Sequence, residues 1–346
     1  MYQDNKEELK MINNIFYGLD IAKMVFHVFT INKDEIVKKQ LSRSQLLKYF
    51  AQQARGVVGI EACGSAHHWA RELEKLGYQV KLLDAKHVKA YLKGNKNDFN
   101  DAEAIYDAVT QVNCREVGKK TIEQQDIQLI HSFRQELMKH KKALVNQIRA
   151  HLRERGIIIS VGMSKFHQQL PELLENETNY LSQISIRSIR AHYEQVKQLE
   201  LLIRENDLEI EQLCRANELS QRLVEIQGIG VMTATILVSD IGKSRTYNKS
   251  RDYAASLGLV PRQYSTGGKP RLLGISKRGN AYIRTLLVHG ARAVLKNIKD
   301  KKDKLSCWCR ALIERRGFNV AAVALANKNA RIVWAMATYG TNYEKP

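Results

Sequence analysis

The sequence predicts an α/β domain with a mixed sheet, then a long helical middle region and a mainly helical C-terminal domain. Two observations lead to this prediction. Apolar, β-branched segments alternate with amphipathic helical segments over residues 1–120, whereas helical periodicity dominates from residue 121 onward. The 346 residues are enough for two or three domains, and we place the boundaries at 1–120, 121–219 and 220–346.

The composition favours a polyanionic partner. Lys and Arg number 55 against 36 Asp and Glu, a formal charge of +19, and phosphate neutralisation favours nucleic-acid binding by such a chain. A membrane partner is not expected, because we find no basic amphipathic helix, no lipidation signal and no apolar run of ~18 residues. With 44% hydrophobic residues and four prolines, the chain has the composition of a globular protein.

The cysteines and the N-terminus predict a reducing cytoplasm. The five cysteines are scattered and form no C-x-x-C pair, which argues against a disulfide framework or a zinc site. The segment MYQDNKEELK is polar and carries acids, unlike a signal peptide. For Cys307-Trp308-Cys309 we expect buried packing.

The N-terminal elements follow in a clear order. Strands are predicted at 14–22 (NIFYGLDIA) and 24–31 (MVFHVFTI) with a turn near Ala22-Lys23, and a third strand at 35–42. A Ser-capped helix is expected within 42–54, a buried strand at 57–62, a helix at 65–77 ending at Gly77, and a strand at 78–85. This order predicts a mixed sheet with helices on its faces.

Four acids occupy the places where such a sheet, of RNase H-like type, would bring them together. Asp20 and Glu61 each close an apolar run, on the first and fourth strands. Asp98 and Asp101 are three residues apart at the start of a helix, so both can face one way. Crowded carboxylates call for hard divalent cations, Mg²⁺ above all, and such clusters act on phosphodiesters. Taken singly, an Asp at a strand end is more often a turn former or a helix cap than a metal ligand, and Asp98 or Asp101 alone could simply favour a helix N-terminus.

Two long helices are predicted in the middle region. Residues 121–155 are helical and basic, which fits either a solvated helix face or a phosphate-binding surface. After Gly156, the apolar IIISVG and the segment before Pro171 are expected to form a local connection. Residues 182–217 have a nearly heptad seam, which predicts packing either against 121–155 in the same chain or against a second subunit. The seam consists of Ile189, Tyr193, Val196, Ile203, Ile210 and Cys214.

The C-terminal domain begins near Ser220 with a helix, a tight Gly-Ile-Gly turn and a second helix, a helix-hairpin-helix-like arrangement. Gly228 and Gly230 permit positive φ and leave N–H groups uncovered beside a helix N-terminus, where a phosphate can bind. A ligand-free helical hairpin explains the pattern nearly as well.

A basic, hydroxyl-bearing loop follows. Between Arg262 and Lys301 there are ten Lys or Arg and one acid. Ser265-Thr266-Gly267-Gly268 reads as a flexible loop, in which a serine is usually a turn residue. A serine among arginines also fits a phosphate-attacking nucleophile, with cations that stabilise the developing charge. The cations that we expect to hold phosphates are Arg262, Lys269, Arg271, Lys277 and Arg278.

The chain resembles, along nearly its full length, the DEDD transposases of bacterial insertion sequences, also called bridge-RNA-guided recombinases. The matching stretches are YGLDIAK, GIEACGS, KNDFNDAEAI, IQGIGVMTATILVSDIG and GLVPRQYSTGGKPRLLGISKRGN. The resemblance implies a RuvC-like domain, a coiled-coil region and a C-terminal transposase domain. It implies that Asp20, Glu61, Asp98 and Asp101 bind Mg²⁺ or Mn²⁺, and that Ser265 is the nucleophile, with Thr266 as the adjacent alternative register.

The same resemblance implies the partners. A structured guide (bridge) RNA pairs with donor and target DNA, and the protein acts as a homo-oligomer, dimer to tetramer, whose acidic and serine domains come from different subunits. A bacterial cytoplasmic location is implied. Two other functions remain open from the residues alone. One is a metal-dependent endonuclease or junction resolvase that uses water as nucleophile, and the other is a non-catalytic nucleic-acid-binding protein.

Overall fold

The structure is a computed structural model that describes residues 15–94, 97–111, 116–175, 181–241 and 247–344. The chain divides into two compact units, the first comprising residues up to 121 with 241–248, and the second 122–240 with 249–346. None of the described helices is long and apolar enough to cross a membrane.

The first unit is built on a six-stranded mixed sheet with the order β3-β2-β1-β4-β5-β6. β1 pairs antiparallel with β2 and parallel with β4, and β4 pairs parallel with β5. The predicted mixed α/β fold is confirmed, and it is consistent with an RNase H/RuvC-like fold. The strands are β1 (Phe16–Ile21), β2 (Val25–Asn32), β3 (Glu35–Ser42), β4 (Val57–Glu61), β5 (Gln79–Leu83) and β6 (Glu116–Val117).

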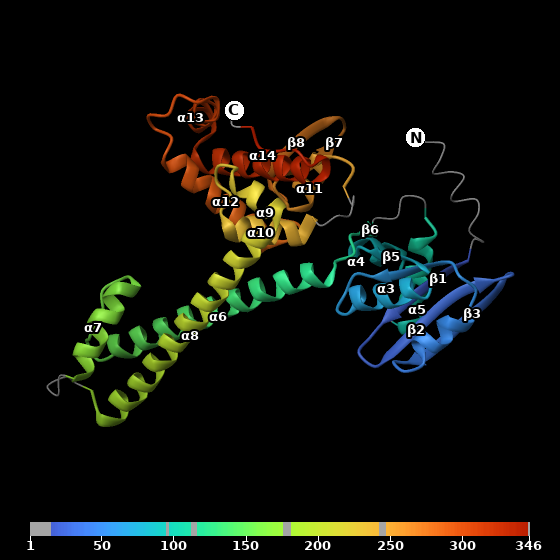
Figure 1. Ribbon diagram of the computed structural model, residues 1–346, viewed down its shortest axis with the longest axis horizontal. Helices are drawn as coiled ribbons and strands as arrows, with labels where there is room; N and C mark the ends of the chain where they lie inside the picture. The colour runs from blue at the N-terminus through green and yellow to red at the C-terminus, as the bar shows by residue number, and fades with distance from the viewer. Residues whose placement is uncertain (1–14, 95–96, 112–115, 176–180, 242–246, 345–346) are drawn as a thin grey trace. The chain divides into compact units, whose positions relative to one another are not determined.

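Helices cover both faces of this sheet (Figure 1). α2 (Leu46–Gln52) and α3 (Ala66–Lys75) share a core with strand residues such as Leu19 and Ile60. On the opposite face α5 (Asp98–Val109) packs Ile105 and Ala108 against Leu83. The short α4 (Ala85–Val88) and a 3₁₀ turn (Lys89–Tyr91) follow β5.

Two glycines let α5 lie unusually close to the sheet. A Cβ added at Gly18 on β1 would lie 2.1 Å from the carbonyl oxygen of Ala102, and one at Gly59 on β4 would lie 2.8 Å from Val109 Cβ. Both glycines face α5, since their strand neighbours Leu19 and Ile60 point into the other core. Close packing there brings the first turn of α5 down to the strand that carries Asp20.

Helix ends in this unit agree only partly with the sequence. Gly77 follows α3 in the left-handed conformation, with φ +87°. Its N–H donates to the Glu74 carbonyl, and the Tyr78 N–H donates to the Leu73 carbonyl. The glycine C-cap predicted for this helix is therefore observed. The Ser cap predicted for α2 is wrong. Gln45 stands at the N-cap without a side-chain cap bond, and its amide oxygen instead accepts from the Ser42 N–H.

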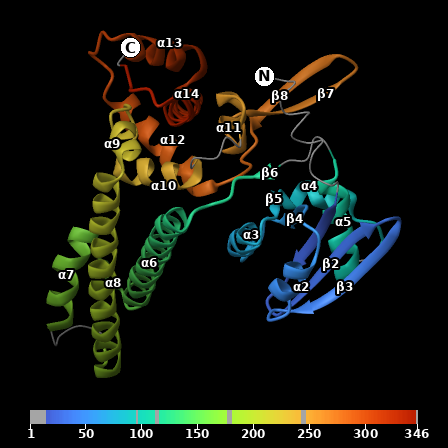
Figure 2. The same cartoon turned by 45° about the vertical axis from the view of Figure 1, so that its right-hand side comes forward.

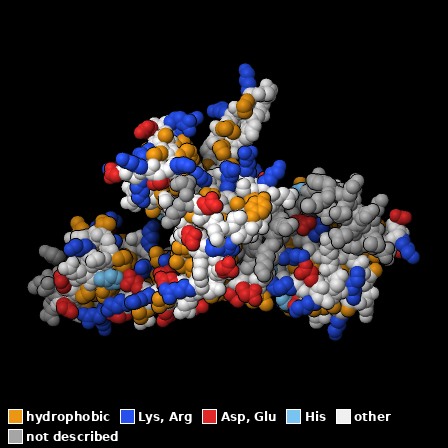
Figure 3. All heavy atoms as spheres, turned by 45° about the horizontal axis from the view of Figure 1, so that its top comes forward, with side chains coloured by type: hydrophobic (Ala, Val, Ile, Leu, Met, Phe, Trp, Pro, Cys, Tyr) orange, Lys and Arg blue, Asp and Glu red, His pale blue; other side chains and the backbone are white. Residues whose placement is uncertain are grey.

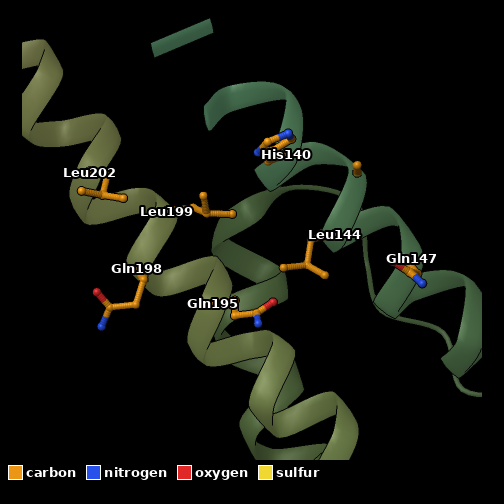
Figure 4. A pocket seen from close by; sticks show the side chains of 8 residues that line it. His140, Leu144, Gln147, Gln195, Gln198, Leu199 and Leu202 are labelled. Atoms are coloured by element: carbon orange, nitrogen blue, oxygen red, sulfur yellow. The ribbon is translucent and has the colours of Figure 1, made fainter. Parts of the chain in front are cut away.

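In the second unit, α6 (Ile122–Arg153) and α8 (Gln183–Ala216) pack against each other as a long antiparallel helical hairpin (Figures 1 and 2). All six predicted seam residues of α8 are buried. Figure 4 shows a groove between the two helices that is lined by Leu144 of α6 and by Leu199 and Leu202 of α8. The intramolecular pairing is therefore observed, and pairing with a second subunit stays a prediction.

The connection predicted after Gly156 is observed for IIISVG, which is not helical, but it is wrong for the segment before Pro171, because α7 (Met163–Glu175) runs through this proline. Phe166, Leu170 and Leu174 of α7 are buried in a core shared with α6 and α8. The apolar spacing of this short segment therefore outweighs the helix-breaking tendency of Pro171.

In the described remainder of the second unit, the regular elements are helices and one β-hairpin. α14 packs on α9, α11, α12 and α13, and it contributes fully buried residues such as Leu325 and Val333. The elements are α9 (Glu218–Val224), α10 (Val231–Ile241), α11 (Ser250–Ser256), β7 (Pro261–Thr266), β8 (Lys269–Ile275), α12 (Ala281–Lys296), α13 (Lys304–Arg316) and α14 (Phe318–Tyr339).

Candidate active site

Three of the four predicted acids converge in the first unit. Carboxylate oxygens of Asp20, Asp98 and Asp101 all lie within 4.8 Å of one another. Asp20 lies near the end of β1, and the other two lie on the first turn of α5, where Asn97 caps the helix by accepting from the Phe99 N–H. The spacing of three residues places both α5 acids on one side of the helix, as predicted.

Glu61 lies outside this group of three but is electrostatically coupled to it. It ends β4, the parallel neighbour of β1, and occupies the same face of the sheet as Gly59. Burial and the charge of Asp101 raise the pKa of the Glu61 carboxyl. The fourth acid therefore borders the site formed by the other three.

The acidic cluster is strained electrostatically in the absence of cations. Burial, reinforced by the charges of Asp101 and Asp98, raises the pKa of Asp20 to about 6. Cys63 follows just beyond Glu61, and partial desolvation of its thiol together with the charges of Glu61 and Asp20 raises its pKa, although the residue as a whole is exposed. A divalent cation would relieve this repulsion, and an all-carboxylate oxygen set is the kind of donor set that Mg²⁺ and Mn²⁺ accept.

Sequence reasoning missed one residue beside the acids. His27 on β2 is the cross-strand partner of Asp20, and its Nδ1 lies 3.9 Å from Asp98 Oδ2. Strand alternation could have revealed it, since residues paired across an antiparallel ladder point to the same face.

The predicted nucleophile lies in the second unit, on an exposed β-hairpin rather than in a flexible loop. Ser265 and Thr266 end β7, and Gly267 and Gly268, with φ of +56° and +75°, form the two-residue turn to β8. Two consecutive positive φ values suit a type I′ turn, which matches the twist of a hairpin. The prediction of a flexible loop is wrong because Gly267 and Gly268 form a tight turn between two paired strands.

The two hydroxyl residues point to opposite faces of this hairpin. Ser265 lies opposite Pro270, and its Oγ accepts a 2.8 Å hydrogen bond from Gln263 Nε2. Thr266 lies opposite Lys269, on the face that also carries Tyr264 and Arg271.

The five predicted phosphate-binding cations are all exposed, on the hairpin and on the segment that follows it. Figure 3 shows Lys and Arg side chains on this part of the surface, including the tip of the projecting hairpin. Among the residues that the structure describes, no ion pair links these five cations to a carboxylate. They are therefore available to an external anion.

The Gly-Ile-Gly turn is held in place by two helices. Gly228 has φ +89°, whereas Gly230 does not have the positive φ that the sequence allowed. Gly290 of α12 packs so closely that a Cβ there would lie 1.8 Å from the Gly228 carbonyl oxygen. Asn329 of α14 donates a 2.9 Å hydrogen bond to the Gln227 carbonyl. The turn and α12 line a shallow pocket that extends to Lys301.

The prediction that Cys307-Trp308-Cys309 is buried is confirmed for Cys309 alone. Cys307 is exposed, and Trp308 is partly exposed with the Lys328 ammonium 5.1 Å from its ring centre. Successive residues of α13 point in different directions, so three adjacent residues cannot all face the core.

Comparisons with known proteins agree along the chain. A DEDD-type transposase model of the IS110 group matches residues 17–156, and the model described as the transposase IS116/IS110/IS902 family matches residues 220–305. The transposase for insertion sequence element IS1111A of Coxiella burnetii is 43% identical over 94% of this chain and 90% of its own length. A probable family 20 transposase of Pseudomonas aeruginosa is 42% identical over 94% of this chain and 97% of its own length. The transposase for insertion sequence element IS1328 of Yersinia enterocolitica is 37% identical over 97% of this chain and 100% of its own length. The chain belongs to the IS110/IS116 family of insertion sequence transposases.

Proposed function

We propose that this transposase cuts and rejoins DNA with Ser265 as the nucleophile, assisted by divalent metal ions on its acidic site. Asp20, Asp98 and Asp101 would hold the metal, Mg²⁺ or Mn²⁺, and Glu61 would complete the set. The observation that carries the proposal is the convergence of three carboxylates within 4.8 Å on one face of the sheet. Bound there, the cation supplies Lewis-acid stabilisation of charge on the oxygens of the scissile phosphate.

The proposed covalent step is a displacement at phosphorus. Ser265 Oγ forms a bond to the scissile phosphorus, the bond from phosphorus to the DNA 3′-oxygen breaks, and the protein is left joined to DNA through phosphoserine. The Oγ proton leaves to an acceptor, and the departing 3′-oxygen gains a proton to become a free hydroxyl. Gln263 supports this role, because its N–H donates to Oγ and leaves the hydroxyl proton free to point at an acceptor.

The exposed cations would hold the DNA rather than read its sequence. Arg262, Lys269, Arg271, Lys277 and Arg278 surround the hydroxyl residues with charge that fits phosphate oxygens. The N–H of Ile229 within the Gly228–Gly230 turn already donates to the Ile226 carbonyl, so a further phosphate would be held by N–H groups of the first turn of α10. Sequence would then be read by a structured guide (bridge) RNA that pairs with donor and target DNA.

The hydroxyl and the acids belong to separate units of the chain. We propose that they meet across one scissile phosphate in a homo-oligomer, dimer to tetramer, in which the serine of one subunit serves the acids of another. The groove and the exposed leucines on the α6–α8 hairpin would support such an assembly (Figure 4).

The test is to trap the protein–DNA adduct under denaturing conditions, with guide RNA, both DNA substrates and Mg²⁺ present. Ser265→Ala should remove the adduct, whereas Thr266→Val, of similar volume and lacking a hydroxyl, should retain it. Asp20→Ala should remove both the adduct and strand cleavage. An adduct lost only in Thr266→Val would move the nucleophile by one residue.

A metal-dependent endonuclease or junction resolvase is the alternative that the acidic site alone supports equally well. In that case water attacks, so the wild-type protein would cleave strands while no adduct is trapped, and Ser265→Ala would cleave at the wild-type rate.

A further inference from the structure

His27 is a buried polar side chain that faces the acidic site. It lies on β2, paired with Asp20 across the antiparallel ladder, so both side chains project from the same face of the sheet. That face is covered by α5, and the His27 ring packs edge-on against Phe99, with ring centres 4.7 Å apart. The residue is 6% exposed. Its ring is therefore held between the sheet and the first turn of α5.

The ring nitrogen Nδ1 of His27 is unsatisfied within the described part of the core. Among the residues that the structure describes, this nitrogen is buried and has no hydrogen-bond partner. Leaving a buried donor or acceptor unpaired costs about 1–3 kcal/mol. Asp98 Oδ2 lies 3.9 Å from Nδ1, which is beyond hydrogen-bond reach, and a movement of roughly 1 Å would bring it to hydrogen-bond distance.

Asp98 is the acid of the cluster that most needs to be held. Its side chain is 66% exposed, whereas Asp20 and Asp101 are half-buried. A freely rotating carboxylate loses conformational freedom when it binds a cation, and a donor that fixes its orientation in advance reduces that cost. In metal sites, hydrogen bonds to the ligating groups commonly change affinity by 10–100-fold.

We propose that His27 is a positioning residue that donates Nδ1–H to Asp98 and turns this carboxylate toward Asp20 and Asp101. The inference rests on the proposed function, because it takes the three aspartates to be the metal ligands. His27 acts only through Asp98 and does not touch the DNA.

The test is to titrate the full-length protein with Mn²⁺ in the absence of nucleic acid. Binding is monitored by calorimetry or by electron paramagnetic resonance of the free ion. His27→Leu, which fills the space without a donor, should weaken Mn²⁺ binding by about tenfold. His27→Asn places an amide N–H near the position of Nδ1 and should stay within about threefold of wild type. Thermal melts in EDTA establish that each variant is folded, and His27→Phe, which also lacks a donor and should weaken Mn²⁺ binding to the same extent, carries the test if the Leu variant does not fold.

A double-mutant cycle separates positioning from a general structural effect. In an Asp98→Ala background, His27→Leu should cause no further loss of Mn²⁺ affinity, since the group through which His27 acts is gone. An equal loss in both backgrounds, or wild-type affinity in His27→Leu, would overturn the inference and leave the metal site intact. A wild-type protein that binds no Mn²⁺ would overturn the metal part of the proposed function as well.

Discussion

Replacing Asp20 by Asn measures how much the charge repulsion and burial in the acidic cluster lower the free energy of unfolding. The substitution keeps the shape of the side chain and removes its charge. Burial and the charges of Asp101 and Asp98 raise the pKa of Asp20 from 3.8 to about 6, which means that the folded state resists ionisation of this carboxyl. Without metal, the Asn variant should therefore be more stable than the wild type at neutral pH, although it cannot bind the cation in the same way.

The magnitude follows from the size of the pKa shift. A rise of about two units corresponds to roughly 3 kcal/mol at ~1.4 kcal/mol per unit. Asp20 is only half-buried, and solvent screening reduces this to about 1–2 kcal/mol. At roughly 4 °C per kcal/mol for a unit of this size, the melting temperature should rise by about 4–8 °C.

The pH dependence has a definite sign. Below pH 3.8 the carboxyl is protonated in both the folded and the unfolded states, so wild type and variant should be equally stable. As the pH rises through the window from 3.8 to about 6, the unfolded state releases this proton more readily, and the wild type loses stability that the variant keeps. Above that window the difference should be constant.

The measurement is chemical denaturation in EDTA across pH 4 to 8, with Asp34→Asn as control. Asp34 is an exposed acid in the turn between β2 and β3, and its φ of +68° suits Asn equally well. Adding Mg²⁺ should stabilise the wild type and the control but not Asp20→Asn, because only an ion bound to the folded state stabilises it. An Asn variant less stable than wild type in EDTA at pH 8 would refute the electrostatic reasoning.

Two further predictions concern the second unit. His131 is buried, with its ring nitrogens 3.1 Å from Tyr282 Oη and 2.9 Å from Thr235 Oγ1, and burial lowers its pKa to about 4. Acidification from pH 6.5 to 4 should therefore lower the free energy of unfolding of the wild type by up to roughly 3 kcal/mol. In urea titrations, His131→Gln should make the free energy of unfolding less dependent on pH over this range. Gly290→Ala would push a Cβ into the Gly228 carbonyl and should cost about 2 kcal/mol or more, whereas Gly274→Ala, with open space around it, should leave the urea midpoint unchanged.

Much of the first unit could be predicted because its signals are local. Continuous apolar runs mark β1 and β2, whose residues are mostly buried, and the turn between them is closed by the Ala22 N–H, which donates to the Val25 carbonyl. The positions of Asp20 and Glu61 follow from strand parity, since parallel neighbours end at the same edge of a sheet. Hydrophobic spacing likewise identified the buried residues of α8 in advance.

The failures have physical causes that a local pattern does not contain. The segment before Pro171 is predicted to be part of a connection, but tertiary packing of Phe166 and Leu170 holds it in the helix α7. The contact between Gly18 and α5 depends on two segments more than 80 residues apart, so its glycine could not be recognised as a packing residue. His27 is a different case, because its pairing with Asp20 follows from the predicted hairpin, and only its approach to Asp98 depends on a distant segment.

The hydroxyls of Ser265 and Thr266 lie on opposite faces of the β7–β8 hairpin, so the identity of the nucleophile decides which face meets the scissile phosphate. Successive residues of a strand point to opposite faces, so Ser265 shares its face with Gln263, and Thr266 shares its face with Lys269 and Arg271. If Ser265 attacks the scissile phosphate, these two cations lie across the strand and are placed for flanking phosphates. If Thr266 attacked, the same cations would lie beside the reacting phosphate itself. The hydroxyl used therefore determines whether these cations hold the DNA or stabilise the charge that develops during displacement.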